Sequence, residues 1–324
     1  MMQNKLRIGI MGLGKISLKS MIPALKQNEK VELTAIASRS YEKAAKIAQS
    51  NGVSHAFGSY EALLKSDHID AVYIALPNHL HCEWAIKAAQ SGKHILCEKP
   101  LASSVEEAQT MIKAAADNNV KLLEAFMYRM HPQHDKVRDI IASGAIGEVQ
   151  HFSASFCYSL SDLNNIRLKK DCAGGALMDV GCYLLDSARW LLGSKIKNAQ
   201  VIFEIGKKSG VDEKCVMQCE MENGISCSLL SSTNMPREHT YKVTGNYGSI
   251  TVPSAYIPPA NKRVHIILKN DDGERIYKIE GINQYAAECE ALADLVLLPE
   301  KHTQLEDGLE NCKIIEKIKE SYEY

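Results

Sequence analysis

The feature that most restricts the fold of this chain is a glycine turn that directly follows its first apolar segment. Leu6 to Met11 has the short apolar pattern of a buried strand and runs into Gly12-Leu13-Gly14-Lys15-Ile16-Ser17. Gly12 permits a tight turn, and Gly14 lets the backbone at Lys15 and Ile16 approach a pyrophosphate at the positive end of the next helix. The third small position is Ser17 in place of Gly or Ala. A strand, this turn and a helix in that order predict a dinucleotide site.

The segment 1–123 alternates short apolar runs with helical patterns, which favours a doubly wound α/β domain with a parallel sheet covered by helices. Ser104 and Glu107 form a capping box that opens a helix over Val105 to Asp117. We place the domain boundary near Leu123, which gives domains 1–123 and 124–324. Four further strands are expected at Glu32 to Ala37, Ala71 to Leu76, His94 to Cys97 and Lys121 to Phe126.

The second domain has runs of alternating polarity separated by turn residues, which predicts an α+β domain with a mostly antiparallel open sheet. Asn223-Gly224 and Asp271-Asp272-Gly273 supply hairpin turns. Helices are expected at Asn283 to Leu298 and Leu305 to Glu320. The expected strands are Val149 to Phe156, Cys215 to Met221, Ser226 to Ser231, Lys242 to Val252 and Arg263 to Lys269.

Composition restricts the class of partner. The formal net charge is -1, with 24% charged and 45% hydrophobic residues, so no broad basic field is available for nucleic acid or a membrane surface. A small-molecule partner is expected. Glycines and a lysine break the apolar N-terminal stretch, so we expect no export signal and a cytoplasmic protein. The ten cysteines are then expected to be thiols without metal-ligand spacing; Cys215 and Cys219 share one strand face and favour packing.

The end of the second expected strand bears on the choice of cofactor. Ser38 and Arg39 stand where an acid would bind the ribose hydroxyls of NAD. Ser38 can donate a hydrogen bond to a 2′-phosphate and Arg39 can pair with it, whereas an Asp would repel it. NADP is therefore favoured. The alternative is that Arg39 is a solvated loop residue and that NAD binds without an acidic partner.

Two other strand ends point to the same edge of the sheet, where open parallel sheets bind ligands. One strand runs into Glu98-Lys99-Pro100, which places Lys99 opposite a nicotinamide ring. The other ends at Leu76 and is followed by Asn78 and His81, which also stand within reach of a cofactor. For His81, a structural position at the start of a helix remains an equal alternative.

In the second domain, Gly174-Gly175 precedes a helical pattern that continues to Leu192 and stops at Gly193. This pattern has one apolar stripe and a second stripe that contains Asp179, Tyr183, Asp186 and Trp190. Two acids and a tyrosine in register exceed what an ordinary core face requires. Spacing alone leaves open the alternative that the second stripe is a solvated polar face with an incidental tyrosine.

Taken in order, the glycine turn, Pro77 to His81, Glu98-Lys99-Pro100 and Gly174 to Tyr183 resemble the Gfo/Idh/MocA oxidoreductases over nearly the whole chain. The resemblance implies a Rossmann domain followed by an α+β domain whose open sheet often forms a subunit interface, and hence a homodimer or homotetramer. It implies that Lys99 is the catalytic lysine and that Asp179 belongs to the site. Tyr183 stands where the family commonly has histidine.

That tyrosine, together with Glu124 to Pro132, resembles the dimeric dihydrodiol dehydrogenases and NADP-dependent D-xylose dehydrogenases, in which tyrosine is the proposed acid/base. An ordinary phenol has a pKa of ~10. A lysine ammonium within about 4 to 6 Å lowers that pKa. The resemblance therefore implies an NADP-linked sugar, polyol or diol dehydrogenase in which Tyr183, assisted by Lys99, takes the proton of a hydroxyl, and Asp179 orients Lys99 or the substrate.

Three other functions remain open. Phe126 to His134 also resembles nucleotide-linked ketosugar 3-reductases, in which Arg129, Arg167, His131 and His134 would help to hold a sugar diphosphate. A redox-silent NADP sensor would keep the glycine turn but would not need both Lys99 and Tyr183. A glycosidase with a tightly held NAD, a variant of the same family, would release sugar without net change in nicotinamide absorbance. The substrate itself is not revealed by the sequence.

Overall fold

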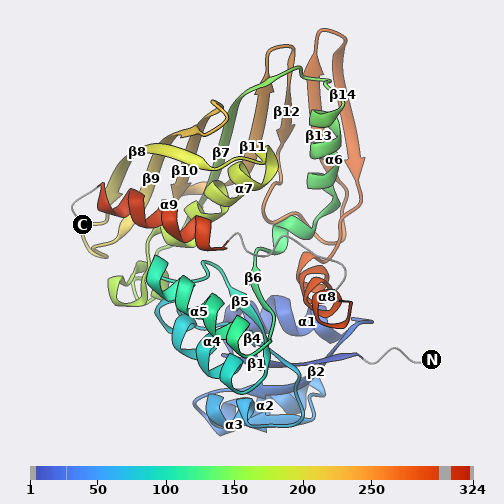
Figure 1. Ribbon diagram of the computed structural model, residues 1–324, viewed down its shortest axis with the longest axis vertical. Coiled ribbons are helices and arrows are strands. Elements are labelled where there is room, and N and C mark those ends of the chain that lie inside the picture. Colours follow the sequence, from blue (N-terminus) through green and yellow to red (C-terminus); the bar gives the residue numbers. More distant parts are fainter. Residues whose placement is uncertain (1–4, 27, 299–307, 322–324) are drawn as a thin grey trace. The chain divides into compact units, whose positions relative to one another are not determined.

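The computed structural model describes residues 5–26, 28–298 and 308–321, which form two compact units (Figure 1). The first unit comprises Met1–Met127 and Gln284–Leu309, and the second comprises Tyr128–Asn283 and Glu310–Tyr324. The helical segment that begins at Gln284 therefore belongs to the first unit, although it is far in sequence from the rest of that unit. The expected start of the last helix at Leu305 lies outside the described residues.

The first unit contains a parallel sheet in the order β3-β2-β1-β4-β5-β6, which confirms the doubly wound α/β prediction. The strand order reverses between β1 and β4, and open sheets of this kind bind ligands at such a reversal. The strands are β1 (Leu6–Met11), β2 (Val31–Ala37), β3 (His55–Phe57), β4 (Ala71–Ile74), β5 (His94–Glu98) and β6 (Leu122–Ala125). The helices are η1 (Ser17–Met21, π-helical), α1 (Ile22–Lys26), α2 (Tyr41–Asn51), α3 (Tyr60–Leu64), η2 (Asn78–Leu80), α4 (His81–Gln90), α5 (Val105–Asp117) and α8 (Gln284–Leu297).

Helix α8 packs into the core of the first unit although it is far from that unit in sequence. Cys289, Leu292 and Ala293 join the same buried cluster as Ile8 and Ile10 of the first strand. The side chain of Asn28 donates to Ala286 O (3.2 Å) and accepts from the amides of Lys30 and Val31 (2.9 Å each), which ties α8 to the start of β2. The helix is therefore part of the nucleotide-binding half.

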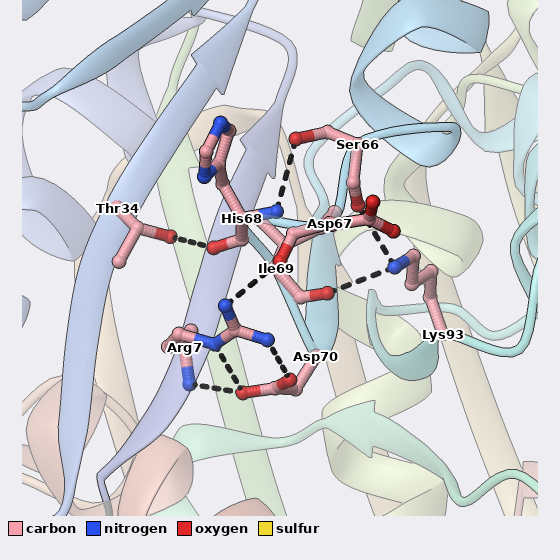
Figure 2. Close-up of polar contacts among 8 residues, drawn as sticks. All are labelled: Arg7, Thr34, Ser66, Asp67, His68, Ile69, Asp70 and Lys93. Carbon is pink, nitrogen blue, oxygen red and sulfur yellow. Dashed lines mark hydrogen bonds and ion pairs between the residues drawn. The ribbon is translucent and has the colours of Figure 1, made fainter.

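Polar contacts hold the amino edge of this sheet, opposite the glycine turn (Figure 2). The guanidinium and main-chain N–H of Arg7 donate to the carboxylate of Asp70, and Arg7 also donates to Asp67 O at 2.7 Å. The ammonium of Lys93 donates to the carbonyls of Ser66 and Ile69 at 2.9 Å. The Arg7 and Asp70 side chains are about two-fifths exposed, so their ion pair contributes roughly 0 to 1 kcal/mol and mainly sets register.

The second unit contains an open sheet in the order β14-β13-β12-β11-β7-β10-β9-β8. Its neighbours pair antiparallel except β7 and β10, which pair parallel, so the mostly antiparallel prediction is confirmed. The strands are β7 (Val149–Ser159), β8 (Ile196–Ile205), β9 (Asp212–Met221), β10 (Ser226–Ser232), β11 (Asn234–Gly245), β12 (Gly248–Val252), β13 (Val264–Asn270) and β14 (Gly273–Ile279). The helices are η3 (Met127–Met130), α6 (Pro132–Ala142), η4 (Ile166–Leu168), η5 (Lys170–Cys172), η6 (Leu177–Gly181, π-helical), α7 (Cys182–Leu192) and α9 (Gly308–Glu320).

One predicted strand is wrong, and three observed strands were missed. The segment Lys242 to Val252 is not one strand, because β11 and β12 meet at a turn over Asn246-Tyr247. Strands β3, β8 and β14 were not predicted. Every residue of β14 is at least partly exposed, so this edge strand lacks the alternation of buried and exposed residues on which the prediction depended.

One face of the second sheet is buried. Cys215 and Cys219 are 0% and 5% exposed, which confirms that they pack on one face of β9. Helix α7 contacts β7 and β10, and α6 contacts β13. Of the helices in the described ranges, none is long and apolar enough to cross a membrane.

Candidate active site

The glycine turn is pressed against the end of β4. Gly12 has a φ of +94°, and a Cβ placed there would lie 2.6 Å from Ala75 O and 2.9 Å from the Leu76 side chain. At Gly14, in contrast, a Cβ would meet no atom within 4 Å. The buried Ser17 hydroxyl donates to Gly12 O at 2.7 Å. The serine in the third position therefore stabilises the turn through a side-chain hydrogen bond. The backbone at Gly14, in contrast, is open to a ligand.

A helical run begins directly after this turn. Leu18 N–H donates to Gly14 O at 3.1 Å, so the amides of Lys15 and Ile16 lie in the first helical turn, where backbone N–H groups face outward from the helix end. Such amides and the partial positive charge of the helix favour an anion. The open surface at Gly14 and this helix end together fit the pyrophosphate of a dinucleotide.

The loop after β2 supplies polar and cationic groups beside the turn. Ser38 is buried with 9% exposure, and its hydroxyl accepts from Ser40 N–H at 3.3 Å. Arg39 is exposed. Sequence reasoning missed Lys43 of α2, whose ammonium donates to Leu13 O at 3.0 Å. A lysine in the first turn of an ordinary surface helix gives no sequence signal for this contact, because the contact depends on how α2 packs beside the turn.

The main chain around Lys99 is fixed on both sides. The Glu98 carboxylate accepts from Tyr73 OH and, at 3.3 Å, from the main-chain N–H of Lys99. Beyond Lys99, the Glu124 carboxylate accepts from Leu101 N–H at 2.7 Å. The Lys99 side chain therefore starts from a rigid point at the carboxyl end of β5.

His81 lies fully buried at the first residue of α4. Its ring nitrogens lie 3.0 Å from Pro100 O and 3.0 Å from Leu76 O, and burial lowers its pKa. The ring joins the ends of β4 and β5 and so holds the Lys99 segment. Asn78, in the short turn before α4, is half-buried, and Leu76 is 8% exposed.

The helix that carries Asp179 and Tyr183 begins at a cap built from a neighbouring strand. Gly175 has a φ of +115°, and a Cβ there would lie 1.9 Å from the Asp212 carboxylate. At Gly174, a Cβ would lie 2.5 Å from Arg167 O. The buried Asp212 accepts from Leu177 N–H at 2.6 Å and so satisfies a free amide at the helix start. Glycine is required at both positions because the chain passes so close to Arg167 O and the Asp212 carboxylate. The sequence analysis missed Asp212 because it is distant in sequence from the helix that it caps.

Both stripes of this helix are buried except at the half-buried Trp190, so the alternative of a solvated polar face is wrong. Tyr183 is 4% exposed. Its ring lies 5.3 to 5.8 Å from the rings of Tyr128, Phe156 and Tyr256, measured between centroids. The tyrosine therefore sits in an aromatic cluster with a fixed orientation.

Two buried acids on this helix carry ion pairs. Asp179 accepts from Tyr158 OH at 2.5 Å and from Arg167 Nε at 2.9 Å. The second acid, Asp186, accepts from Tyr128 OH at 2.5 Å and from Arg129 Nε at 2.9 Å, and a second guanidinium nitrogen of Arg129 also contacts it. Arg129 is 12% exposed and engaged with Asp186, whereas Arg167 is 43% exposed.

His131 and His134 are buried and neutral. Burial lowers the pKa of His131 to about 4 and that of His134 to about 3. His134 Nδ1 lies 2.9 Å from Tyr241 OH, and Nε2 lies 3.1 Å from Ala255 O. Within the described ranges, no group of three or more His, Cys, Asp or Glu side chains is placed to hold a metal ion.

Residues 6–126 match an oxidoreductase family with a NAD-binding Rossmann fold, and residues 134–251 match the GFO/IDH/MocA C-terminal domain. The chain belongs to this family. It is 35% identical to a D-xylose 1-dehydrogenase (NADP(+)) of Haloferax volcanii over 97% of each chain. It is 30% identical to dTDP-3,4-didehydro-2,6-dideoxy-alpha-D-glucose 3-reductase of Actinomadura kijaniata over 98% of this chain and 95% of the relative.

A solved 3-ketoreductase from Actinomadura kijaniata, in complex with NADP and TDP-benzene, superposes with a TM-score of 0.92 at 29% identity over 98% of each chain. Membership confirms the expected family and nicotinamide-dependent oxidoreductase class. The residues at the glycine turn fit the cofactor that this class uses.

Replacing Gly12 with Ala should weaken binding of NAD(P)H by roughly tenfold or more, because a Cβ would collide with Ala75 O and strain a positive-φ backbone. Fluorescence titration of the purified protein measures this affinity. Gly52→Ala is the matched control, since Gly52 has a φ of +70° but no atom within 4 Å of a Cβ. Equal affinities for the two variants would contradict the proposed close approach.

Proposed function

We propose that this enzyme transfers hydride between NADP and a hydroxyl of a sugar or a related polyol or diol. Tyr183 acts as acid/base with assistance from Lys99. The observation that carries the proposal is the placement of these two residues. Lys99 follows a main chain fixed at the carboxyl end of β5, and Tyr183 is buried on a capped helix. Neither placement is needed by a redox-silent sensor.

The relatives support the same pair of residues. Solved variants of the Actinomadura kijaniata 3-ketoreductase replace one tyrosine or one lysine. Those two positions stand the same number of residues apart as Lys99 and Tyr183. The relatives named as D-xylose 1-dehydrogenase and trans-1,2-dihydrobenzene-1,2-diol dehydrogenase support a sugar or diol hydroxyl as the reacting group.

When bound, the nicotinamide ring accepts or supplies the hydride. The phenolic oxygen of Tyr183 takes the proton from the substrate hydroxyl during oxidation and returns it during reduction. A phenolate is the stronger base, and the ammonium of Lys99 favours it over the phenol. Asp179 lies one helical turn before Tyr183 and forms an ion pair with Arg167. This ion pair orients the partly exposed guanidinium of Arg167 toward substrate hydroxyls.

The groups beside the glycine turn favour NADP. Lys43 contacts the turn, Ser38 and the exposed Arg39 follow β2, and the β2 end carries no acid to repel a 2′-phosphate. Two positive charges and a hydroxyl suit a phosphate dianion. The NADP(+)-linked name of the Haloferax relative and the NADP complexes of the 3-ketoreductase support this choice.

A second candidate is a sugar-nucleotide 3-ketoreductase, favoured by the close structural match to the Actinomadura enzyme. The groups expected to hold a diphosphate are now fewer: Arg129 is engaged with Asp186, and His131 and His134 are neutral. Arg167 remains available in part. Loss of NADPH absorbance on adding a deoxynucleotide ketosugar, with no NADP reduction by aldoses or diols, would favour this candidate over the first.

We further propose a cytoplasmic homodimer or homotetramer formed through the outer face of the second sheet. Ile202, Val216 and Leu230 form a row across β8, β9 and β10 on that face, and Ile202 is 71% exposed. An exposed apolar row of this kind is typical of a subunit interface. Light scattering of the purified protein measures the mass in solution, and a monomer at micromolar concentration would contradict the proposal.

Replacing Lys99 with Ala should lower turnover by roughly two to four orders of magnitude, the range of a lost acid/base contribution, with NADP affinity largely kept. Tyr183→Phe should give a comparable loss. In the double variant, the loss of transition-state stabilisation should be smaller than the sum of the two single losses, because both residues act on one proton. Stopped-flow hydride transfer with a substrate found by screening aldoses, inositols and dihydrodiols provides the measurement.

Lys113→Ala is the control for that series, since Lys113 is 74% exposed and pairs with Asp117 on the surface of α5. Near wild-type turnover in the Lys99→Ala enzyme would refute the assignment of this lysine.

Replacing Arg39 with Ala should raise the KM for NADP by roughly 10- to 100-fold, the effect expected for a lost charged hydrogen bond of about 1.5 to 3 kcal/mol. The KM for NAD should change little, because NAD lacks the 2′-phosphate. Initial-rate kinetics with both cofactors tests this, and Arg275→Ala on the exposed strand β14 serves as control. A parallel change for NAD and NADP would show that Arg39 does not select the phosphate.

A further inference from the structure

The phenol ring of Tyr183 is held by aromatic neighbours that are themselves tied to its own helix. Tyr128 of η3 and Tyr256 in the loop after β12 are both 0% exposed, and the ring of each lies 5.8 Å from the ring of Tyr183 between centroids. The hydroxyl of Tyr128 donates to Asp186 at 2.5 Å. The hydroxyl of Tyr256 lies 2.9 Å from that of Ser187. Asp186 and Ser187 follow Tyr183 by one turn of α7, so both hydrogen bonds return to the helix that carries the proposed acid/base.

The carboxylate of Asp186 is a fixed acceptor for the Tyr128 hydroxyl. It is 0% exposed and also accepts from Arg129 Nε at 2.9 Å and from Asn311 Nδ2 of α9 at 3.1 Å. The guanidinium of Arg189 donates to Asn311 Oδ1 and so holds that amide from its other side. A hydrogen bond to a charged acceptor is short and strong. Since Arg129 and Asn311 already satisfy the buried carboxylate, the Tyr128 hydroxyl is not needed to keep this acid in place.

Ring contacts alone define the position of a phenol loosely. Contacts between aromatic rings are favourable over centroid distances of about 4.5 to 7 Å, so a ring held only by other rings can slide. A group that transfers a proton, in contrast, must lie within about 2.6 to 3.2 Å of the hydroxyl that it deprotonates. The directional hydrogen bond to Asp186 removes this freedom from the ring of Tyr128. The ring of Tyr128 then limits where the ring of Tyr183 can lie.

We propose that Tyr128 is a positioning residue for Tyr183 and that it acts through the hydrogen bond from its hydroxyl to Asp186. This hydrogen bond fixes the ring of Tyr128, which confines the ring of Tyr183 and keeps its phenolic oxygen in one place for the substrate hydroxyl. The proton of the Tyr128 hydroxyl takes no part in the reaction. The effect of Tyr128 on turnover rests on the proposed function, whereas the confinement of the Tyr183 ring does not.

The kinetic test removes the Tyr128 hydroxyl and nothing else. In Tyr128→Phe, turnover should fall by roughly tenfold or more while the KM for NADP stays within about twofold, because displacing a proton-transfer group slows the reaction and leaves the cofactor site intact. Tyr241→Phe is the matched control, since Tyr241 is also 0% exposed and its hydroxyl lies 2.9 Å from His134 Nδ1. None of the ring contacts of Tyr241 in the described part of the chain is with Tyr183. Equal turnover in the two variants would overturn the proposal.

A double variant separates positioning from a general loss of structure. Adding Tyr128→Phe to Tyr183→Phe should change the residual turnover by no more than about twofold, because the ring that Tyr128 positions no longer carries the acid/base oxygen. A loss of the same size in both backgrounds would contradict the positioning role. Wild-type turnover in Tyr183→Phe alone would refute the proposed function. An inactive Tyr183→Phe beside a fully active Tyr128→Phe would instead refute only the role of Tyr128.

Nuclear magnetic resonance tests the confinement of the ring without any substrate. In protein labelled with carbon-13 tyrosine, the ring signals of Tyr183 are identified by their absence in Tyr183→Phe. We expect these signals to broaden through conformational exchange in Tyr128→Phe and to stay sharp in Tyr241→Phe, because only the first change frees the ring to sample more than one position. Tyr183 signals that are the same in wild type and Tyr128→Phe would show that the hydrogen bond to Asp186 does not confine this ring.

Discussion

The nucleotide-binding half of this enzyme depends on the contact between Gly12 and the end of β4. Because Gly12 has no side chain, β1 can turn directly over Ala75 O, and the helix behind it starts close to the sheet edge. Ser17 fixes the turn from the helix side. β1 pairs with both β2 and β4, so the ends of these two strands lie on either side of the turn, where open parallel sheets bind ligands.

In the second unit, glycines again allow the chain to pass close to neighbouring atoms at the start of a helix. Gly174 and Gly175 allow the chain to pass against Arg167 O and the Asp212 carboxylate, and Asp212 then caps the helix that carries Asp179 and Tyr183. Gly12 in the first unit, and Gly174 with Gly175 in the second, let a helix begin against a neighbouring strand or loop. In the second unit, Asp179 and Tyr183 are thereby presented from a capped helix start.

Local pattern was sufficient for the elements that this arrangement uses. The bounds of β1 and of α5 agree with the prediction from apolar periodicity and the capping box, because both signals are encoded within a few neighbouring residues. Lys43 and Asp212 gave no such signal, since each gains its role from a partner distant in sequence. Likewise, no pattern could indicate that Arg129 is engaged with Asp186, because that ion pair forms only when η3 packs on α7.

Among the buried acids in the described part of the chain, Asp179 and Asp186 differ chemically from Glu288. Asp179 and Asp186 each face a guanidinium and a phenol, so their charge is neutralised locally and orients the groups around it. Glu288 of α8 is 1% exposed, and neither of its carboxylate oxygens has a hydrogen-bond partner in the described part of the chain. Burial, followed by the charge of Glu98, raises its pKa well above the ordinary range. An ion pair between fixed partners is insensitive to moderate pH, whereas a buried carboxyl with a raised pKa is not. The helix that carries Tyr183 is held by acids whose charge is neutralised by such fixed partners.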